Sequence, residues 1–301
     1  MKSTTSTDAA AAYARQKRID FAHELKDRKI VYLDTKYWAL LRDVRLGRSK
    51  CDQTKALLSR LEEDVREGKC VCPLNSDVMF EVMKQSDAVT LTATVKMIDD
   101  LSLGACLIPW PDRIDMELFH YVESLRGDRE LHDLFDLAWT KSAYVLGFTT
   151  PDEYSLSDWL NAQVQRDFID HLWTQGLADI LDEIGPEFVA TKEDAFEDIT
   201  PKLNAGKIEY FHQNKTFQDL YLSEVFGALG GCEDQLGDLA RYMFTRDTEL
   251  EAPLPSPSIP VGKLMAHAIF KAFHDNTIGQ ALPTIQIEAA LHAAVRWDRN
   301  R

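Results

Sequence analysis

The sequence has no long hydrophobic run and few cysteines. No stretch approaches the roughly 18 consecutive apolar residues of a membrane-spanning helix, so no transmembrane segment is predicted. The N-terminal residues lack the apolar core of a signal peptide, which leads us to expect a cytoplasmic location. The cysteines number five in 301 residues, an odd and low count, so no disulfide framework is predicted.

Basic residues are outnumbered by acidic ones. The chain has 34 lysines and arginines against 49 aspartates and glutamates, a net charge of −15. This balance argues against a protein that coats nucleic acid, because such binding neutralises phosphates with lysine and arginine. It does not exclude a nuclease, since a magnesium site is itself acidic and a local basic rim can hold the substrate. Arg42, Arg45, Arg48 and Lys50 are a candidate rim, although a solvated helix end explains them better.

Several familiar motifs are absent. The sequence contains no GxGxxG, Walker A or GxSxG element, so nothing indicates a dinucleotide, P-loop or serine-hydrolase site. Cys70 and Cys72 fall on one face of a short predicted strand, but a zinc site needs about four ligands and no second pair follows. We therefore predict that both are core residues. His267 and His274 share a helix face without a HExxH arrangement, which favours packed or solvent-facing side chains.

Apolar runs and helical periodicity alternate in the first third of the chain. Strands are predicted at residues 30–33, 70–73 and 105–108, the last closed by Pro109 and Pro111, and helices lie between them. Asn75 or Ser76 can cap the helix that follows the second strand. The helix at 51–67 is the clearest, with Leu57, Leu58, Leu61 and Val65 on one side and Gly68 as its stop. This order predicts an α/β fold with a parallel sheet flanked by helices.

Helical patterns dominate the rest of the chain. They predict a large all-helical insertion or second domain, in which helices are expected at 129–146, 155–184 and 190–204 among others, and a last helix that starts near Thr284. We expect an N-terminal tail and helix at 1–28 and the α/β part at 29–114. The helical insertion is expected at 115–276, and a C-terminal helix at 277–301 is expected to return to the α/β part.

Two carboxylates follow the first two predicted strands. Asp34 ends the most apolar strand, and Glu81 lies on the helix after the second strand. Ligands collect at the carboxyl ends of parallel strands, so both side chains are expected in one crevice. Paired carboxylates repel each other, and a hard divalent cation relieves the repulsion by using their oxygens as ligands.

These two segments, YLDTKYW (32–38) and SDVMFEV (76–82), resemble the first two acidic motifs of the PIN domain, a family of metal-dependent ribonucleases that includes bacterial toxins. The resemblance implies a PIN-like sheet, Mg²⁺ or Mn²⁺ as cofactor and RNA as substrate. It implies Asp34 and Glu81 as metal ligands. Thr35 matches the hydroxyl residue that often supports the site, and Asp77 is a candidate for a supporting role one turn before Glu81. Lys36 departs from the asparagine common at its position.

The acids that the family places near its fourth strand have no match here. The chain reaches Asp298 directly after its last predicted helix, without a further apolar strand. Either a longer protein supplies those acids, or Asp298 or an acid of the insertion replaces them, or the site is incomplete. Two hypotheses follow. The first is a metal-dependent endoribonuclease with Asp34, Glu81 and Asp298 as catalytic residues. The second is a catalytically incomplete PIN-like scaffold that binds a protein partner, such as an antitoxin or a defence-system component, through its helical region.

Overall fold

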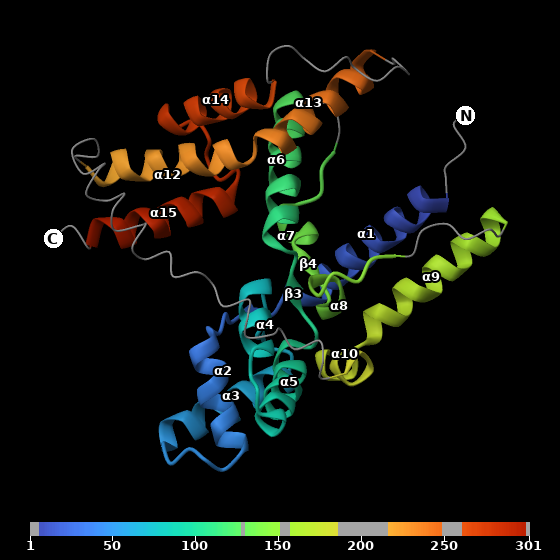
Figure 1. The fold of residues 1–301 in the computed structure, drawn as a ribbon, viewed down its shortest axis with the longest axis vertical. Helices are drawn as coiled ribbons and strands as arrows, with labels where there is room; N and C mark the ends of the chain where they lie inside the picture. The colour runs from blue at the N-terminus through green and yellow to red at the C-terminus, as the bar shows by residue number, and fades with distance from the viewer. Residues whose placement is uncertain (1–5, 128–129, 151–156, 186–215, 249–260, 299–301) are drawn as a thin grey trace. The chain divides into compact units, whose positions relative to one another are not determined.

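The structure is a computed structural model that describes residues 6–127, 130–150, 157–185, 216–248 and 261–298 (Figure 1). Its contacts divide the chain into two compact units. The first contains Met1–Pro109 and His132–Ala195, and the second contains Trp110–Leu131 and Phe196–Arg301. The boundaries expected from sequence remain a prediction. Among the described residues, no helix is both long enough and apolar enough to cross a membrane.

The first unit is built mainly from helices. In Figure 1, α1 and α9 lie side by side, and Asp170 of α9 holds them together by accepting a hydrogen bond from the Tyr13 hydroxyl at 2.8 Å and pairing with Lys17 at 2.5 Å. The helices are α1 (Ser6–Leu25), α2 (Thr35–Arg45), α3 (Asp52–Arg66), α4 (Ser76–Met83), α5 (Ala88–Ser102), α7 (Leu134–Leu137), α8 (Ser142–Val145), α9 (Asp158–Thr174) and α10 (Leu177–Ile184).

The strands are only two residues long. Those described are β1 (Lys29–Ile30), β2 (Cys70–Val71), β3 (Cys106–Leu107) and β4 (Trp139–Thr140). β1 pairs with β2 in parallel, β3 pairs with β4 antiparallel, and an isolated parallel bridge joins Leu74 to Cys106. The expected α/β fold, a PIN-like parallel sheet flanked by helices, is therefore wrong, because the described residues are mostly helical and form only two small sheets.

Helix starts explain why the strands stop so early. The predicted first strand ran to Leu33, but only one further ladder bond follows β1, from the Val31 N–H to the Val71 carbonyl at 2.9 Å. Asp34 then caps α2, and Asn75 caps α4 soon after β2. A run of four apolar residues indicates burial without distinguishing a long strand from an extended approach to a helix. The three predicted strands overlap β1, β2 and β3, but these strands do not form the predicted parallel sheet.

The core of the first unit gathers around Trp38, which is completely buried. Packed with it are Leu41 of α2, Met79 of α4 and Ile98 of α5. The α3 helix adds its predicted apolar side, except that Leu57 is exposed, and Gly68 follows the helix with φ +75°, as a C-terminal stop requires.

A partly buried carboxylate joins α5 to α10. Asp99 accepts hydrogen bonds from the backbone N–H of Leu177 at 2.7 Å and of Ala178 at 2.9 Å, so it caps a helix 78 residues away in sequence. A Cβ on Gly176 would lie 2.9 Å from Asp99 Oδ2, which explains the glycine at this close approach. The tie fixes the position of α10 on the core.

We expect Asp99→Asn to lower the free energy of unfolding by about 1–2 kcal/mol, since the asparagine NH2 group would face one of the two backbone N–H groups, whereas both oxygens of a carboxyl, protonated or not, can accept. Burial raises the pKa of the Asp99 carboxyl above its ordinary value. The folded protein therefore holds this proton more tightly, and the group's contribution to stability decreases as pH rises from the ordinary carboxyl pKa through the raised one. Urea unfolding of both proteins from pH 4 upward measures this. The difference in free energy of unfolding between the wild type and Asp99→Asn should become smaller as pH rises. A difference that grows with pH would contradict a raised pKa for Asp99.

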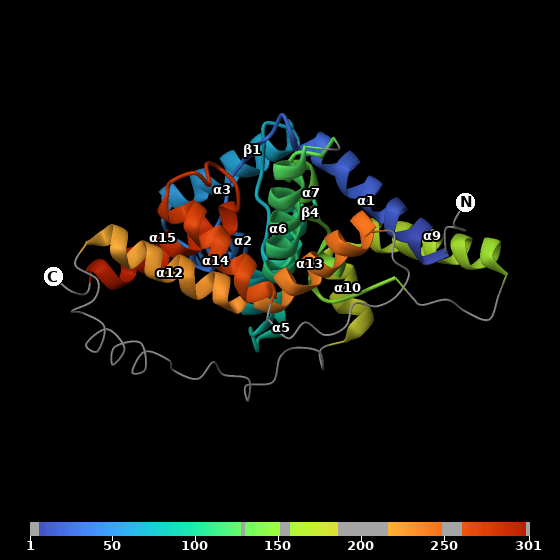
Figure 2. The same ribbon diagram turned by 90° about the horizontal axis from the view of Figure 1, so that it is seen from above.

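The described residues of the second unit form helices and no strands. They are α6 (Trp110–Arg126), α12 (Phe217–Gly231), α13 (Glu233–Thr248), α14 (Val261–His274) and α15 (Pro283–Asp298). Within this unit α12 packs on both α14 and α15, and Figures 1 and 2 show these three helices side by side. Glu117 of α6 accepts hydrogen bonds from the Thr284 backbone N–H at 2.9 Å and from its hydroxyl at 2.6 Å, which caps α15.

Several predicted helices differ from those described. The pattern at 129–146 gives two short helices around β4, and the pattern at 155–184 breaks at Gly176 into α9 and α10. Pro111 was expected to close a strand, but it lies in the first turn of α6, where its missing N–H costs no hydrogen bond. The helix predicted at 190–204 lies outside the described residues.

The cysteines are all free. Four are buried, as predicted for Cys70 and Cys72, and Cys51 is exposed at the start of α3. Burial raises the pKa of the Cys72 and Cys106 thiols to about 12. The Thr54 side chain and nearby backbone N–H groups instead lower the pKa of Cys51.

We therefore expect Cys51 to react first with a thiol reagent such as Ellman's reagent near neutral pH, because the thiolate is the reactive form and only this sulfur is both exposed and acidified. The native protein should show one fast thiol and all five after denaturation. Cys51→Ser should remove the fast phase. A fast phase that survives this substitution would show that a buried cysteine is accessible.

Candidate functional site

The first part of the candidate site is the turn that starts α2. Tyr32 and Asp34 are exposed on either side of buried Leu33, as alternation along an extended segment requires. Asp34 is the N-cap of α2, and its Oδ1 accepts a hydrogen bond from the Thr35 backbone N–H at 2.8 Å. This carboxylate therefore lies at the positive end of the helix dipole.

The second part is the solvent face of α4. Asn75 caps this helix by accepting a hydrogen bond from the Val78 N–H at 3.0 Å. Asp77, Phe80 and Glu81 follow at the spacing that shares one helix face, and all three are exposed. Two carboxylates and an aromatic ring thus occupy one short helical surface.

Direct contacts join the two parts. The Thr35 hydroxyl donates a hydrogen bond to Glu81 Oε2, across 46 residues of sequence. The Asn75 amide donates to Asp77 Oδ2 at 3.4 Å, and the same side chain acts on the Tyr32 hydroxyl, whose pKa it lowers. The starts of α2 and α4 are therefore neighbours, and we call Tyr32, Asp34, Thr35, Asp77 and Glu81 the acidic cluster.

The pKa of the Tyr32 hydroxyl is sensitive to the negative charge of this cluster. Its partial burial raises the pKa of Tyr32, and the negative charges of Asp34, Asp77 and Glu81 raise it further. A phenolate here would be repelled by three carboxylates, so the same three groups would attract a cation. Three predicted site residues, Asp34 from one segment and Asp77 and Glu81 from another, thus all lie close enough to affect the Tyr32 hydroxyl.

The oxygen donors suit a hard cation that keeps part of its water. Magnesium commonly uses one or two protein carboxylates and completes its shell with water and substrate phosphates. In the described part of the chain, no group of three or more His, Cys, Asp or Glu side chains is arranged to hold a metal. Asp298 is the last residue of α15, in the other unit, and its side chain lies outside the described residues.

Three of the four residues of the predicted basic rim contact the protein itself, and the fourth, Lys50, is exposed. Arg42 donates to Asp43 and Gln85, and Arg45 pairs with Glu62 at 2.7 Å and with Asp100 at 2.6 Å. Arg48 donates to the Thr90 hydroxyl at 3.0 Å. The three arginines therefore connect α2 and the residues after it with α3, α5 and the segment between α4 and α5.

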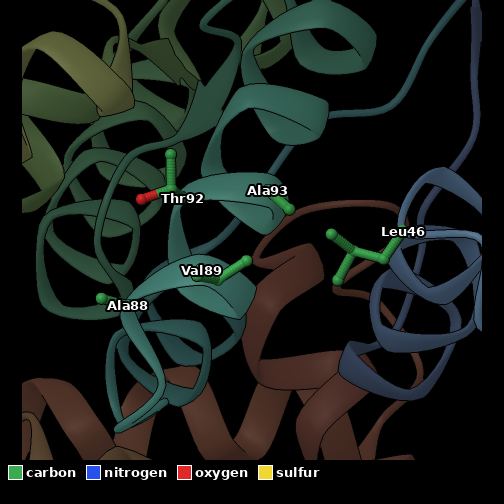
Figure 3. A pocket seen from close by; sticks show the side chains of 5 residues that line it. All are labelled: Leu46, Ala88, Val89, Thr92 and Ala93. Atoms are coloured by element: carbon green, nitrogen blue, oxygen red, sulfur yellow. The ribbon is translucent and has the colours of Figure 1, made fainter.

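An apolar hollow of about 400 Å³ lies between the end of α2 and the start of α5. Figure 3 shows Leu46 pointing toward Val89 and Ala93, with Thr92 as the only polar side chain of the lining. None of the lining residues is titratable, so the hollow offers no group for acid–base or metal chemistry.

Tyr32 was part of the sequence motif but received no role there. The signal that identifies it is its spacing of two from Asp34, which places both side chains on one face of the extended segment. Asn75 was one of two predicted helix caps, with Ser76, and its effect on Tyr32 depends on how α4 meets the start of α2. Sequence spacing alone carries no such information.

Comparison with known proteins adds no relative. No family model, no curated protein and no solved structure matches this chain. The function must therefore be argued from the acidic cluster itself.

Proposed function

We propose that the chain is a metal-dependent endoribonuclease, in which Asp34 and Glu81 hold one Mg²⁺ or Mn²⁺ ion. The observation that carries the proposal is the meeting of two distant carboxylates beside Thr35 and Tyr32 on an exposed surface. An exposed cluster is accessible to a polymer, which a buried one is not.

The surroundings suit a phosphate as well as a cation. The N-termini of α2 and α4 meet at the cluster, and helix N-termini present positive dipole ends and N–H groups to anions. A bound divalent ion would lower the pKa of a coordinated water and neutralise charge on the phosphate. Thr35 orients the Glu81 carboxylate by its hydrogen bond, and Asp77 adds negative charge beside it. We place this activity in the cytoplasm.

Two measurements test the proposal. Mn²⁺ is paramagnetic, so binding should broaden the backbone NMR signals of Tyr32, Asp34 and Glu81 before those of other residues. Incubation with a mixed RNA pool should then give Mn²⁺-dependent cleavage. Specific broadening without cleavage would leave a cation site and refute the nuclease. Uniform broadening without cleavage would refute both.

A protein-binding role is the second candidate. It is favoured by the absence of a three-ligand group among the described residues and by the internal use of the arginine side chains. In that case the helical region would bind an antitoxin or a defence-system component, and the RNA pool would stay intact. Stable co-purification with one such protein, unchanged by Asp34→Asn, would support this candidate over the nuclease.

A further inference from the structure

The α15 helix exposes an aliphatic face. Ile287, Leu291 and Val295 are 61%, 60% and 51% exposed. They recur every four residues, so they form one stripe along the helix. Ala290 and Ala294 lie beside this stripe at the intervening positions. We call these five residues the α15 stripe.

The opposite side of α15 is apolar as well. Ile285 and Ala289 are buried there, within the core that α15 shares with α12 and α6, and Ala293 is buried on the same side. A helix that is apolar around most of its circumference is typical of a buried helix. Contiguous exposed apolar surface of this kind marks an interaction site.

Charges next to the stripe are already paired within the second unit. Glu288 accepts a hydrogen bond from the Trp110 indole at 2.8 Å. Arg296 pairs with Glu224 at 2.6 Å, and His292 lies 3.7 Å from the same carboxylate. The stripe itself contains no charged residue, so it does not select a charged partner.

The net charge of −15 makes most approaches between two copies repulsive. The stripe is a surface on which no carboxylate opposes a carboxylate. In an antiparallel pair centred on Leu291, Ile287 of one copy faces Val295 of the other, and Glu288 and Arg296 fall opposite uncharged positions. The alanines allow two helices to approach to the close end of the usual range, about 8 Å.

We propose that the α15 stripe is a self-docking surface, on which α15 of a second copy packs antiparallel about a two-fold axis at Leu291. A two-fold interface uses the same patch on both copies, as this self-complementary arrangement requires. The proposal is independent of the function proposed for the acidic cluster.

Sedimentation equilibrium of the full chain tests it. The wild type should be a dimer at a protomer concentration of about 100 µM. Leu291→Glu places two carboxylates at the axis and should raise the dimer dissociation constant at least about 100-fold. Leu264→Glu is the matched control, because Leu264 is an equally exposed leucine, 58%, on α14 of the same unit. Circular dichroism confirms that each variant remains folded.

Cross-linking gives a second readout that does not depend on a disruptive substitution. In a Cys51→Ser background, Leu291→Cys should form a covalent dimer on mild oxidation, because residues at a two-fold axis are close enough for a disulfide. Leu264→Cys should not. A monomeric wild type, a dimer that Leu291→Glu leaves intact, or equal cross-linking through Leu264→Cys would each overturn the proposal. It would also be overturned if the Leu291→Cys variant were a monomer whose new thiol is protected from maleimide, since another part of the chain would then cover the stripe.

Discussion

Replacing Asp34 by asparagine is expected to reduce Mn²⁺-dependent RNA cleavage at least about 100-fold, because the substitution removes a charged metal ligand. Asparagine caps helices as well as aspartate does, and its side-chain oxygen can still accept the Thr35 N–H. The free energy of unfolding should therefore stay within about 0.5 kcal/mol of the wild-type value. Cleavage rates and urea unfolding measured on one preparation separate the two effects.

Asp52→Asn is the matched control. Asp52 also lies at the start of a helix, its side chain is 92% exposed, and it is paired with Lys55 rather than placed in the acidic cluster. Its cleavage rate should equal that of the wild type. Equal loss in both variants would show that general acidity, and not the cluster, supports the reaction.

Glu81→Gln keeps an acceptor for the Thr35 hydroxyl and removes the second charge. If Asp34 and Glu81 hold one ion, the double variant should be no slower than the slower single variant, since either change already removes the ion. Losses that multiply would instead mean that the two residues act separately.

The parts of the fold predicted correctly are those decided locally. The apolar side of α3, the stop at Gly68 and the cap at Asn75 each follow from residues within one or two helical turns. The sheet was predicted wrongly because strand pairing depends on distant segments, and apolar runs of four residues do not specify it. The same limit applies to Arg45, whose acidic partners come from α3 and α5.

In the candidate site, too, some residues were predicted from local sequence and others depend on packing. Asp34 and Glu81 were identified from their places after two apolar runs, and the Thr35–Glu81 hydrogen bond brings their segments together. The role of Tyr32 beside three carboxylates depends on the packing of α4 against α2, which no local pattern encodes. Asp298, the third predicted catalytic residue, ends α15 in the second unit.

The packing of α2 has its own expected result. Trp38→Ala should lower the free energy of unfolding by about 3–5 kcal/mol, since it empties a completely buried site in the core of the first unit. Trp159→Ala, on a residue that is 74% exposed, should change it by no more than about 0.5 kcal/mol. Chemical unfolding of both variants measures the contrast, and a small loss for Trp38→Ala would contradict the described core.

Trp38 also connects stability to the acidic cluster. It lies one helical turn after Asp34, so its burial holds the start of α2 in place. Under conditions where Trp38→Ala remains folded, Mn²⁺ should broaden the backbone NMR signals of Tyr32 and Asp34 less than in the wild type. This variant should therefore lose both Mn²⁺ binding and free energy of unfolding. Asp34→Asn should lose the broadening at full stability. If Trp38→Ala keeps the full broadening, the cluster is positioned by the Thr35–Glu81 contact and not by the core beneath α2.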